Sequence, residues 1–426
     1  MSDSGIILTG RTGDQLLDAD IFLRNGQRIL RPRVDLGSIV QDSSFLGAFG
    51  GLITQEETPI PNMQISFPYN INNVYSRVVT AGGGTVIQAS SQAVLEVATN
   101  LVQSAQLESI GSARYSPGQG QTVRFTATFF VGVLNLDQEA GVGDLADGFF
   151  FGYVDQAFGI IRRQNSVDDF IPQASWNVDV MDGTGPSGMT LDTTLGNVYT
   201  IRYQWLGFGA IRFFIEDEDT GLPQLVHVIQ YANANITPSV FNPSLPLHAR
   251  ISNTDAGGVG LTAQLKIGSM GAYAEGPINQ SGGRFSTGNR KTAITVETNI
   301  ISIRCDATVF TGQTNRGRVK LDALSAAISG GADAQVRLVL NATLGGAPVF
   351  NAIDAARSIV SFDVAGTTVT GGREIRRIAS TGNFQETQDF SDLNIRLNPG
   401  DVLTLSASSF GAAVAANVCP AWVEEL

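Results

Sequence analysis

The stretch NVYTIRYQWLGFGAIRFFIEDEDTGLPQLVHVIQYANANITPSVFNPSLPLHAR, residues 197–250, decides the fold class. It contains three runs rich in aromatic and β-branched residues: Tyr199–Trp205, Ala210–Ile215 and Gln224–Tyr231. A Gly-Phe-Gly turn and an acidic turn, EDEDTG, separate them, so the pattern predicts a meander of three antiparallel strands. Because a sheet with one apolar face needs a second layer to cover it, we expect the flanking segments to complete a β-sandwich.

Strand signals continue on both sides of this meander. Segments such as SRVVTAGGGTVIQAS, QTVRFTATFFVGV, GFFFGYVDQAFGIIRR and LTAQLKIGSMGAY combine short apolar runs or period-two alternation with Gly-rich turns. Together they predict about ten antiparallel strands over residues 76–274, which is typical of a jelly-roll or concanavalin-like sandwich.

Three further segments complete the expected organisation. Residues 275–293 are mostly polar and Gly-rich, which indicates a linker. Residues 294–426 carry about eight more short strand signals and predict a smaller jelly roll. Residues 1–75 hold apolar patches, Ile21–Leu23 and Ile29–Leu30, without local partners. They predict an extended arm that lies against another body, and an additional strand pair packed on the next domain is an equally favoured alternative.

Composition excludes some classes of function. The formal net charge is −12, and Lys266, Lys291 and Lys320 are the only lysines, so a nucleic-acid-binding surface is not expected. No segment reaches the roughly 20 apolar residues of a membrane helix, and the N-terminus has no pattern of a secretory signal. We therefore expect folding in a cytoplasm with Cys305 and Cys419 as free thiols, although a disulfide between early and late strands of the second unit is geometrically possible.

Several acidic and histidine residues are candidates for chemistry. Glu216, Asp217 and Glu218 suggest the paired carboxylates of a glycoside hydrolase, but they lie in a turn sequence and a solvated turn is favoured. Two other acidic sets suggest a calcium site, although turn formation explains them better. His227 is expected at the apolar face of its strand and His248 near a strand start, each as a structural residue. The two other acidic sets are Asp144 with Asp147, and Asp179 with Asp182 and Asp192.

A group of aromatic residues suggests a platform on which sugars stack, but packing in the core is favoured for its in-register members, Tyr203, Trp205 and Phe213. Three asparagines meet the glycosylation sequon, which predicts nothing without a secretory signal. No nucleotide-binding, zinc or nucleophile-elbow motif occurs, so we expect no catalytic, metal or cofactor residue. The aromatic group is Tyr199, Tyr203, Trp205, Phe208, Phe213 and Phe214, and the sequons begin at Asn235, Asn279 and Asn341.

Long motifs in the chain resemble virion structural proteins of tailed bacteriophages and some large DNA viruses. The resemblance rests on RYSPGQGQTVRFTATFF, GDLADGFFFGYVDQAFGIIRR and YTIRYQWLGFGAIRFFIEDEDTG. The closing segments, including NRGRVKLDALS, LNPGDVLTLSASS and AWVEEL, are similar to the C-terminal jelly roll often joined to that sandwich. The resemblance covers residues 78–426 and implies two consecutive sandwiches that serve as a fibre, spike, decoration, tail or baseplate component.

These observations together predict a non-enzymatic structural subunit of a virus particle. We expect the N-terminal arm to dock on other virion proteins, the subunit to form a symmetric oligomer, most readily a trimer, and the protein to reside in the virion after synthesis in the host cytoplasm. The alternatives are a protein that binds host-surface carbohydrate for attachment and, less favoured, an enzyme that cleaves glycans. No nucleic acid, membrane or cofactor is expected as a partner.

Overall fold

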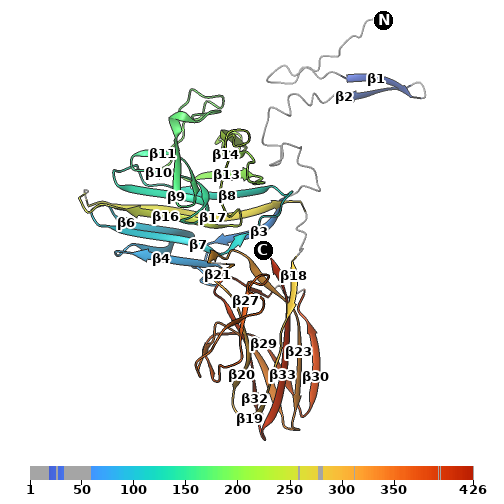
Figure 1. Ribbon diagram of the computed structural model, residues 1–426. Coiled ribbons are helices and arrows are strands. Elements are labelled where there is room, and N and C mark those ends of the chain that lie inside the picture. The colour runs from blue at the N-terminus through green and yellow to red at the C-terminus, as the bar shows by residue number, and fades with distance from the viewer. Residues whose placement is uncertain are drawn as a thin grey trace.

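The computed structural model describes residues 59–257, 260–276, 282–310, 312–391, 393 and 395–425, and only the backbone of residues 19–24, 27–32 and 59. Within these ranges every paired strand is antiparallel, and the one helical element is the short 3-10 turn η3 (Gln173–Ser175). The chain is therefore all-β, as predicted, and it is built from two successive sandwiches that Figure 1 shows one below the other.

The first sandwich consists of a seven-stranded and an eight-stranded sheet. In sheet order the first is β12 (Val167–Pro172), β11 (Ala157–Gln164), β10 (Gly148–Val154), β9 (Leu136–Gly143), β16 (Leu245–Asn253), β7 (Gln103–Ala113) and β4 (Ser76–Ala81). The second is β15 (Pro223–Ile229), β14 (Ile211–Glu216), β13 (Asn197–Tyr203), β8 (Gln121–Thr128), β17 (Thr262–Glu275), β6 (Gln92–Ala98) and β5 (Thr85–Ala89), with β3 (Pro59–Ser66) paired to β17.

The core of this sandwich lies between the two sheets and is rich in aromatic rings. The meander predicted from residues 197–231 is β13, β14 and β15, and its register places Ile201 opposite Phe213. Tyr199 packs on Phe151 of the facing sheet with ring centroids 4.9 Å apart. Alternate residues of each strand point inward. The inward-facing aromatic and β-branched side chains of these runs therefore pack in the core.

The second sandwich consists of two six-stranded sheets. The first contains β18 (Gly283–Ser286), β33 (Val414–Glu425), β23 (Arg318–Ser329) and β30 (Phe384–Asp389), with β19 (Asn289–Ile294) on β33 and β31 (Arg396–Leu397) on β23. The other is β26 (Asn351–Ala352), β27 (Val360–Asp363), β20 (Thr298–Cys305), β32 (Val402–Ser409), β24 (Ala334–Leu340) and β29 (Arg373–Ser380). Two short ribbons complete it: β21 (Thr308–Val309) with β22 (Gln313–Thr314), and β25 (Thr343–Leu344) with β28 (Val369–Thr370).

The core of the second sandwich is aliphatic, unlike the aromatic core of the first. Isoleucine, leucine and valine side chains of both sheets surround Trp422, which is fully buried. Cys305 is buried in β20 and Cys419 is half-buried in β33, and both thiols are free. The two cysteines lie in different sheets, so the free thiols expected from the sequence agree with the structure.

Two segments expected to lie outside the sandwiches contribute strands to them. β3 falls within the predicted arm and adds a strand next to β17 of the first sandwich. β18 and β19 fall within the predicted linker and pair with β33 of the second sandwich. Farther toward the N-terminus, β1 (Ala19–Arg24) and β2 (Gln27–Pro32) form a hairpin that stands apart from both sandwiches in Figure 1. Residues 1–18, 25–26 and 33–58 of the predicted arm lie outside the described residues.

The two sandwiches meet through a buried ion pair and a close backbone approach. Arg316 of the second sandwich has a side chain only 6% exposed, and its Nη2 lies 2.5 Å from Oδ2 of Asp144 and 3.7 Å from Oδ2 of Asp147 in the first. Its Nη1 also donates to the carbonyl of Asn242 at 2.9 Å. At Gly111 of β7, an added Cβ would come within 3.1 Å of Oδ1 of Asn398. A side chain there would therefore push the sandwiches apart, because such contacts are tighter than ordinary packing allows.

Candidate functional site: the groove between the two sandwiches

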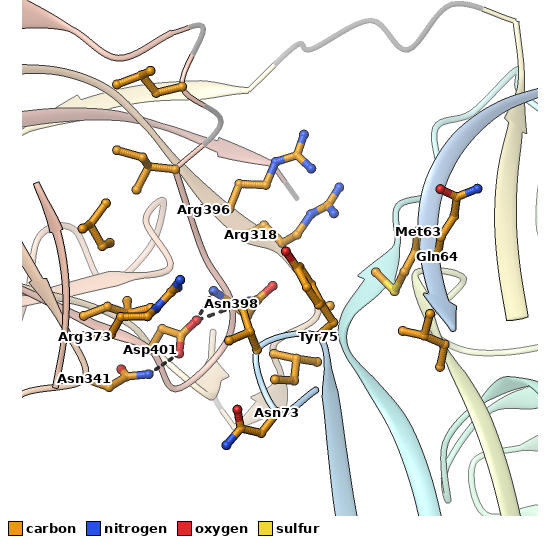
Figure 2. A pocket seen from close by; sticks show the side chains of 18 of the residues that line it. Met63, Gln64, Asn73, Tyr75, Arg318, Asn341, Arg373, Arg396, Asn398 and Asp401 are labelled. Atoms are coloured by element: carbon orange, nitrogen blue, oxygen red, sulfur yellow. Dashed lines mark hydrogen bonds between the residues drawn. The ribbon is translucent and has the colours of Figure 1, made fainter. Parts of the chain in front are cut away.

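A groove of about 860 Å³ lies where the two sandwiches meet. The first sandwich supplies residues 61–65 of β3, residues 73–75 of the following loop, and Ile110 and Gly111 of β7. The second supplies Arg318 of β23, the ends of β24 and β29, and the loop around β31. Figure 2 shows side chains of both walls facing the same space. Pockets at such junctions are common places for ligands.

The wall of the second sandwich is held rigid by amide and carboxylate groups. Asp401 accepts hydrogen bonds from Nδ2 of Asn341 at 2.8 Å and from the backbone N–H of Asn398 at 2.8 Å. Oδ1 of Asn341 in turn accepts from the backbone N–H of Val402 at 2.9 Å. Because each side chain is fixed by a partner, these amides present their remaining polar atoms in defined positions.

The other notable feature of the groove is its set of arginines. Arg318 is buried, and its Nη2 lies 3.5 Å from Oε2 of Glu425. Burial, together with the positive charges of Arg396 and Arg114, lowers the pKa of Arg318 to about 10, while Glu425 acts in the opposite direction. Figure 2 shows the guanidinium groups of Arg318 and Arg396 next to each other, extending toward the wall that carries Met63 and Gln64.

A second polar cluster covers the outer face of the seven-stranded sheet of the first sandwich. His248 of β16 is fully buried between two carboxylates, with Nδ1 3.2 Å from Oε1 of Glu108 and Nε2 2.9 Å from Oε1 of Glu139. Arg163 donates to both oxygens of Glu139 at 3.0 and 2.7 Å and to Asp168 at 2.6 and 2.9 Å. Acidic and basic side chains thus alternate across the sheet: the acidic ones are on β7 and β9, and the basic ones are on β16 and β11.

The electrostatics of this cluster favour ion pairing over acid catalysis. Burial alone would lower the pKa of His248, but its two carboxylate partners raise it above the ordinary 6.5. Burial alone would raise the pKa of Glu108, but His248 and Arg77 lower it to about 2. The pKa of Glu139 is lowered as well, by His248 and Arg163. A retaining hydrolase needs one carboxyl with a raised pKa to protonate the leaving group, and neither carboxyl of this pair meets that requirement.

Of the three acidic residues at 216–218, Glu216 ends β14, and Asp217 and Glu218 lie in the turn that follows it. Asp217 accepts hydrogen bonds from the backbone N–H groups of Asp219 and Thr220, while Glu216 pairs with Arg124 and Glu218 is exposed. The structure therefore brings Glu216 and Glu218 into no cleft, as the turn interpretation predicted.

The aspartates that the sequence analysis weighed as calcium ligands cap turns, which is the interpretation it favoured. Asp179 accepts from the N–H groups of Met181 and Ser187, while Asp182 and Asp192 accept from the residues two positions later. Asp144 and Asp147 bind backbone N–H groups and Arg316. Within the described ranges no group of three or more His, Cys, Asp or Glu side chains could hold a metal ion. Those same ranges contain no helix long and apolar enough to span a membrane.

The aromatic group lies mostly in the core, as the sequence analysis favoured over a sugar-stacking platform. Tyr199, Tyr203 and Phe213 are buried in the first core, and Phe214 is buried on the opposite face beneath Arg202. Trp205 is half-buried against that core and donates to the carbonyl of Val240 at 3.1 Å. Phe208, the sixth member, is 36% exposed and lies 6.1 Å from the ring of Tyr231.

The remaining candidates have local roles. His227 is 6% exposed, and its Nδ1 accepts from the backbone N–H of Asn177 at 3.1 Å, so it is a structural histidine as predicted. Asn341 belongs to the groove, Asn235 donates to the carbonyl of Tyr231, and Asn279 lies outside the described residues. The sequence analysis missed the groove arginines and the partners of His248. An alternating Asp-x-Glu pattern in LDQEAGVG was the available signal for Glu139.

Comparison with known proteins supports the fold and assigns no family. No family model and no curated protein matches the chain. Among solved structures, an endo-1,3-β-glucanase from Streptomyces sioyaensis is 9% identical, with 53% of this chain and 99% of that chain covered and a TM-score of 0.36. A glycosyl hydrolase family protein from Mycobacterium fortuitum is 11% identical, with 50% and 99% covered and a TM-score of 0.36. The exoplasmic/lumenal domain of VIP36, in a Ca²⁺/Man₃GlcNAc-bound form, is 11% identical, with 52% and 92% covered and a TM-score of 0.31.

These neighbours contradict one expectation. The prediction that the chain is not an enzyme is withdrawn, because glucanases and other glycosyl hydrolases are among the structures with a similar sandwich. The sequence analysis took the solvated turn at residues 216–221 as grounds for excluding hydrolysis, but one unsuitable acidic segment does not exclude an activity from a whole fold. At this level of similarity the neighbours show the fold alone.

The cluster around His248 generates a prediction for stability. A histidine whose pKa is raised on folding contributes stability that is complete below its unfolded value of 6.5 and is lost as pH rises through the folded pKa. Replacement His248→Gln should therefore lower the free energy of unfolding by about 3 kcal/mol at pH 6, and the difference from wild type should shrink at higher pH. Chemical denaturation at pH 6, 7.5 and 9 measures this.

His227→Gln is a control for which the opposite pH dependence of the stability effect is expected. Burial lowers its pKa, so its contribution is lost as pH falls through 6.5, and the effect of His227→Gln should grow with rising pH. An effect of His248→Gln that is constant across the three pH values would contradict the assignment of a charged imidazole.

Proposed function

We propose that the protein is a structural subunit of a virus particle, as its resemblance to virion proteins implies, and that it assembles as a symmetric oligomer. The observation that supports this most is the hairpin of β1 and β2. Its register pairs Ile21 with Leu30 and Phe22 with Ile29. An isolated two-stranded hairpin is marginally stable in water at best. A covering surface is therefore required, and the proposal assigns that surface to another virion protein.

The two sandwiches suit a projecting part of such a particle. The apolar faces of their strands are buried in two separate cores. Contacts with other proteins would therefore use the outer surfaces of the sandwiches. A closed oligomer would also cover free sheet edges such as β5 and β12, which otherwise offer unpaired backbone groups to other chains. We propose an interface of more than about 1,000 Å² for this oligomer.

The particle assignment predicts a result for the intact virus. An antibody against the first sandwich should label the surface of purified particles in electron micrographs. The double variant Phe22→Asp/Ile29→Asp should be missing from particles, because two charges in the hairpin prevent burial of its faces. The control Asp20→Asn, in the same strand, should be incorporated normally. Absence of the wild-type protein from purified particles would refute the proposal.

A second candidate function is binding of a host-surface saccharide in the groove. The specific observation is Tyr75, which is 61% exposed and lines the groove, where Figure 2 shows its ring near the side chain of Asn398. An exposed aromatic ring next to fixed amides offers a stacking surface and hydrogen bonds for sugar hydroxyl groups.

This candidate predicts retention on a glycan array. Replacement Tyr75→Ala should weaken binding about tenfold by removing the stacking surface. Phe410→Ala is the matched control, since Phe410 is 65% exposed and lies outside the groove. If Tyr75→Ala and Phe410→Ala bind the retained saccharides equally well, the saccharides bind outside the groove.

A further inference from the structure

Several arginines gather at the groove. The register of β23 with β31 pairs Lys320 with Arg396, so Arg396 lies on the same face of the sheet as Arg318. Arg114 is close enough to Arg318 to act on its charge. The carboxylate that pairs with Arg318 is Glu425, at 3.5 Å. This concentration is unusual in a chain with a net charge of −12 and a pI near 4.7.

Among the described residues of the groove lining, the carboxylates are Glu374 and Asp401, and both are already engaged. Both carboxylate oxygens of Glu374 bind Arg377, at 2.9 and 2.8 Å, and one of them also binds Nε of Arg337 at 2.7 Å. The oxygens of Asp401 accept from Asn341 and Asn398. Neither carboxylate is therefore placed to neutralise Arg318 and Arg396.

Arg396 itself has unused hydrogen-bonding capacity. Its Nε is buried and has no hydrogen-bond partner. A buried donor without a partner costs stability, and a guanidinium that stays charged gains most from an oxyanion that accepts two N–H groups at once. The two guanidinium groups lie next to each other at the groove, an arrangement that suits one oxyanion placed between them.

We propose that the groove binds the anionic group of an acidic saccharide, a sulfate ester or a carboxylate, between Arg318 and Arg396. The amides of Asn341 and Asn398 and the ring of Tyr75 line the same groove and bind the neutral part of the sugar. This inference rests on the proposed saccharide-binding role of the groove and specifies its ligand class. A carboxylate or sulfate is favoured over a bare hydroxyl because it alone neutralises the arginine pair.

The proposal is tested with two labelled tetrasaccharides of galactose, one sulfated and one without sulfate, and with inorganic sulfate as competitor. Wild-type protein should bind the sulfated form at least about tenfold more tightly, as the loss of one charge-assisted hydrogen-bond pair implies. The variant Arg396→Gln should lose this preference while it retains the weaker binding of the neutral form. Inorganic sulfate should compete with the sulfated form in wild type only.

The control is Arg376→Gln, which removes an exposed arginine of β29 that does not line the groove. It should leave the preference unchanged. Thermal unfolding of each variant shows that it is folded, and Arg396 is suitable because it is less buried than Arg318. Equal binding of both tetrasaccharides by wild type would overturn the anion site and leave saccharide binding intact. Binding of neither would overturn both. A preference that survives in Arg396→Gln would place the anion elsewhere.

Discussion

The buried ion pairs of Arg316 with Asp144 and Asp147 fix the position of one sandwich on the other. A guanidinium this deeply buried is tolerated only with charged partners, so separation of the sandwiches would leave three charged groups without compensation. Asp144 is in turn connected to the first sandwich, because its carbonyl accepts from Arg163 at 3.0 Å. The walls of the groove lie on either side of this junction, and its shape therefore depends on the same contacts.

From Arg163 the charges continue across the outer face of the seven-stranded sheet, through Glu139 and His248 to Glu108. In many sandwiches such a face is simply solvated, but here its polar side chains are buried and paired with one another. Pairing of this kind specifies register, since a shift of one residue would direct every charge into the aromatic core. The cluster therefore supports the loop at residues 144–147 on which the second sandwich docks.

The sequence predicted the fold class and the central meander because aromatic and β-branched residues alternate clearly in β13 and β14. It did not predict β9, where Asp137, Gln138 and Glu139 interrupt the apolar pattern, although this strand lies in the middle of its sheet. Glu139 belongs to the charged cluster, and Gln138 binds the backbone of Phe130, so the polar residues that interrupt the apolar pattern are ones that the structure uses for pairing. The groove was not predicted either. Arg318 and Arg396 come together through the pairing of β23 with β31, and Tyr75 joins them only through the docking of the two sandwiches. No local pattern encodes that contact.

The central claim is that the two sandwiches form one rigid unit whose junction preserves a groove with an arginine-rich wall. Double electron–electron resonance between nitroxide labels at Val79→Cys and Phe410→Cys tests it most directly, since both positions are exposed and lie in different sandwiches. The labelling is done on a Cys419→Ser background, while burial raises the pKa of the Cys305 thiol and protects it from reaction. The account predicts a single narrow distance distribution in solution. A broad or two-peaked distribution would contradict it, because the sandwiches would then move independently and no fixed groove would exist.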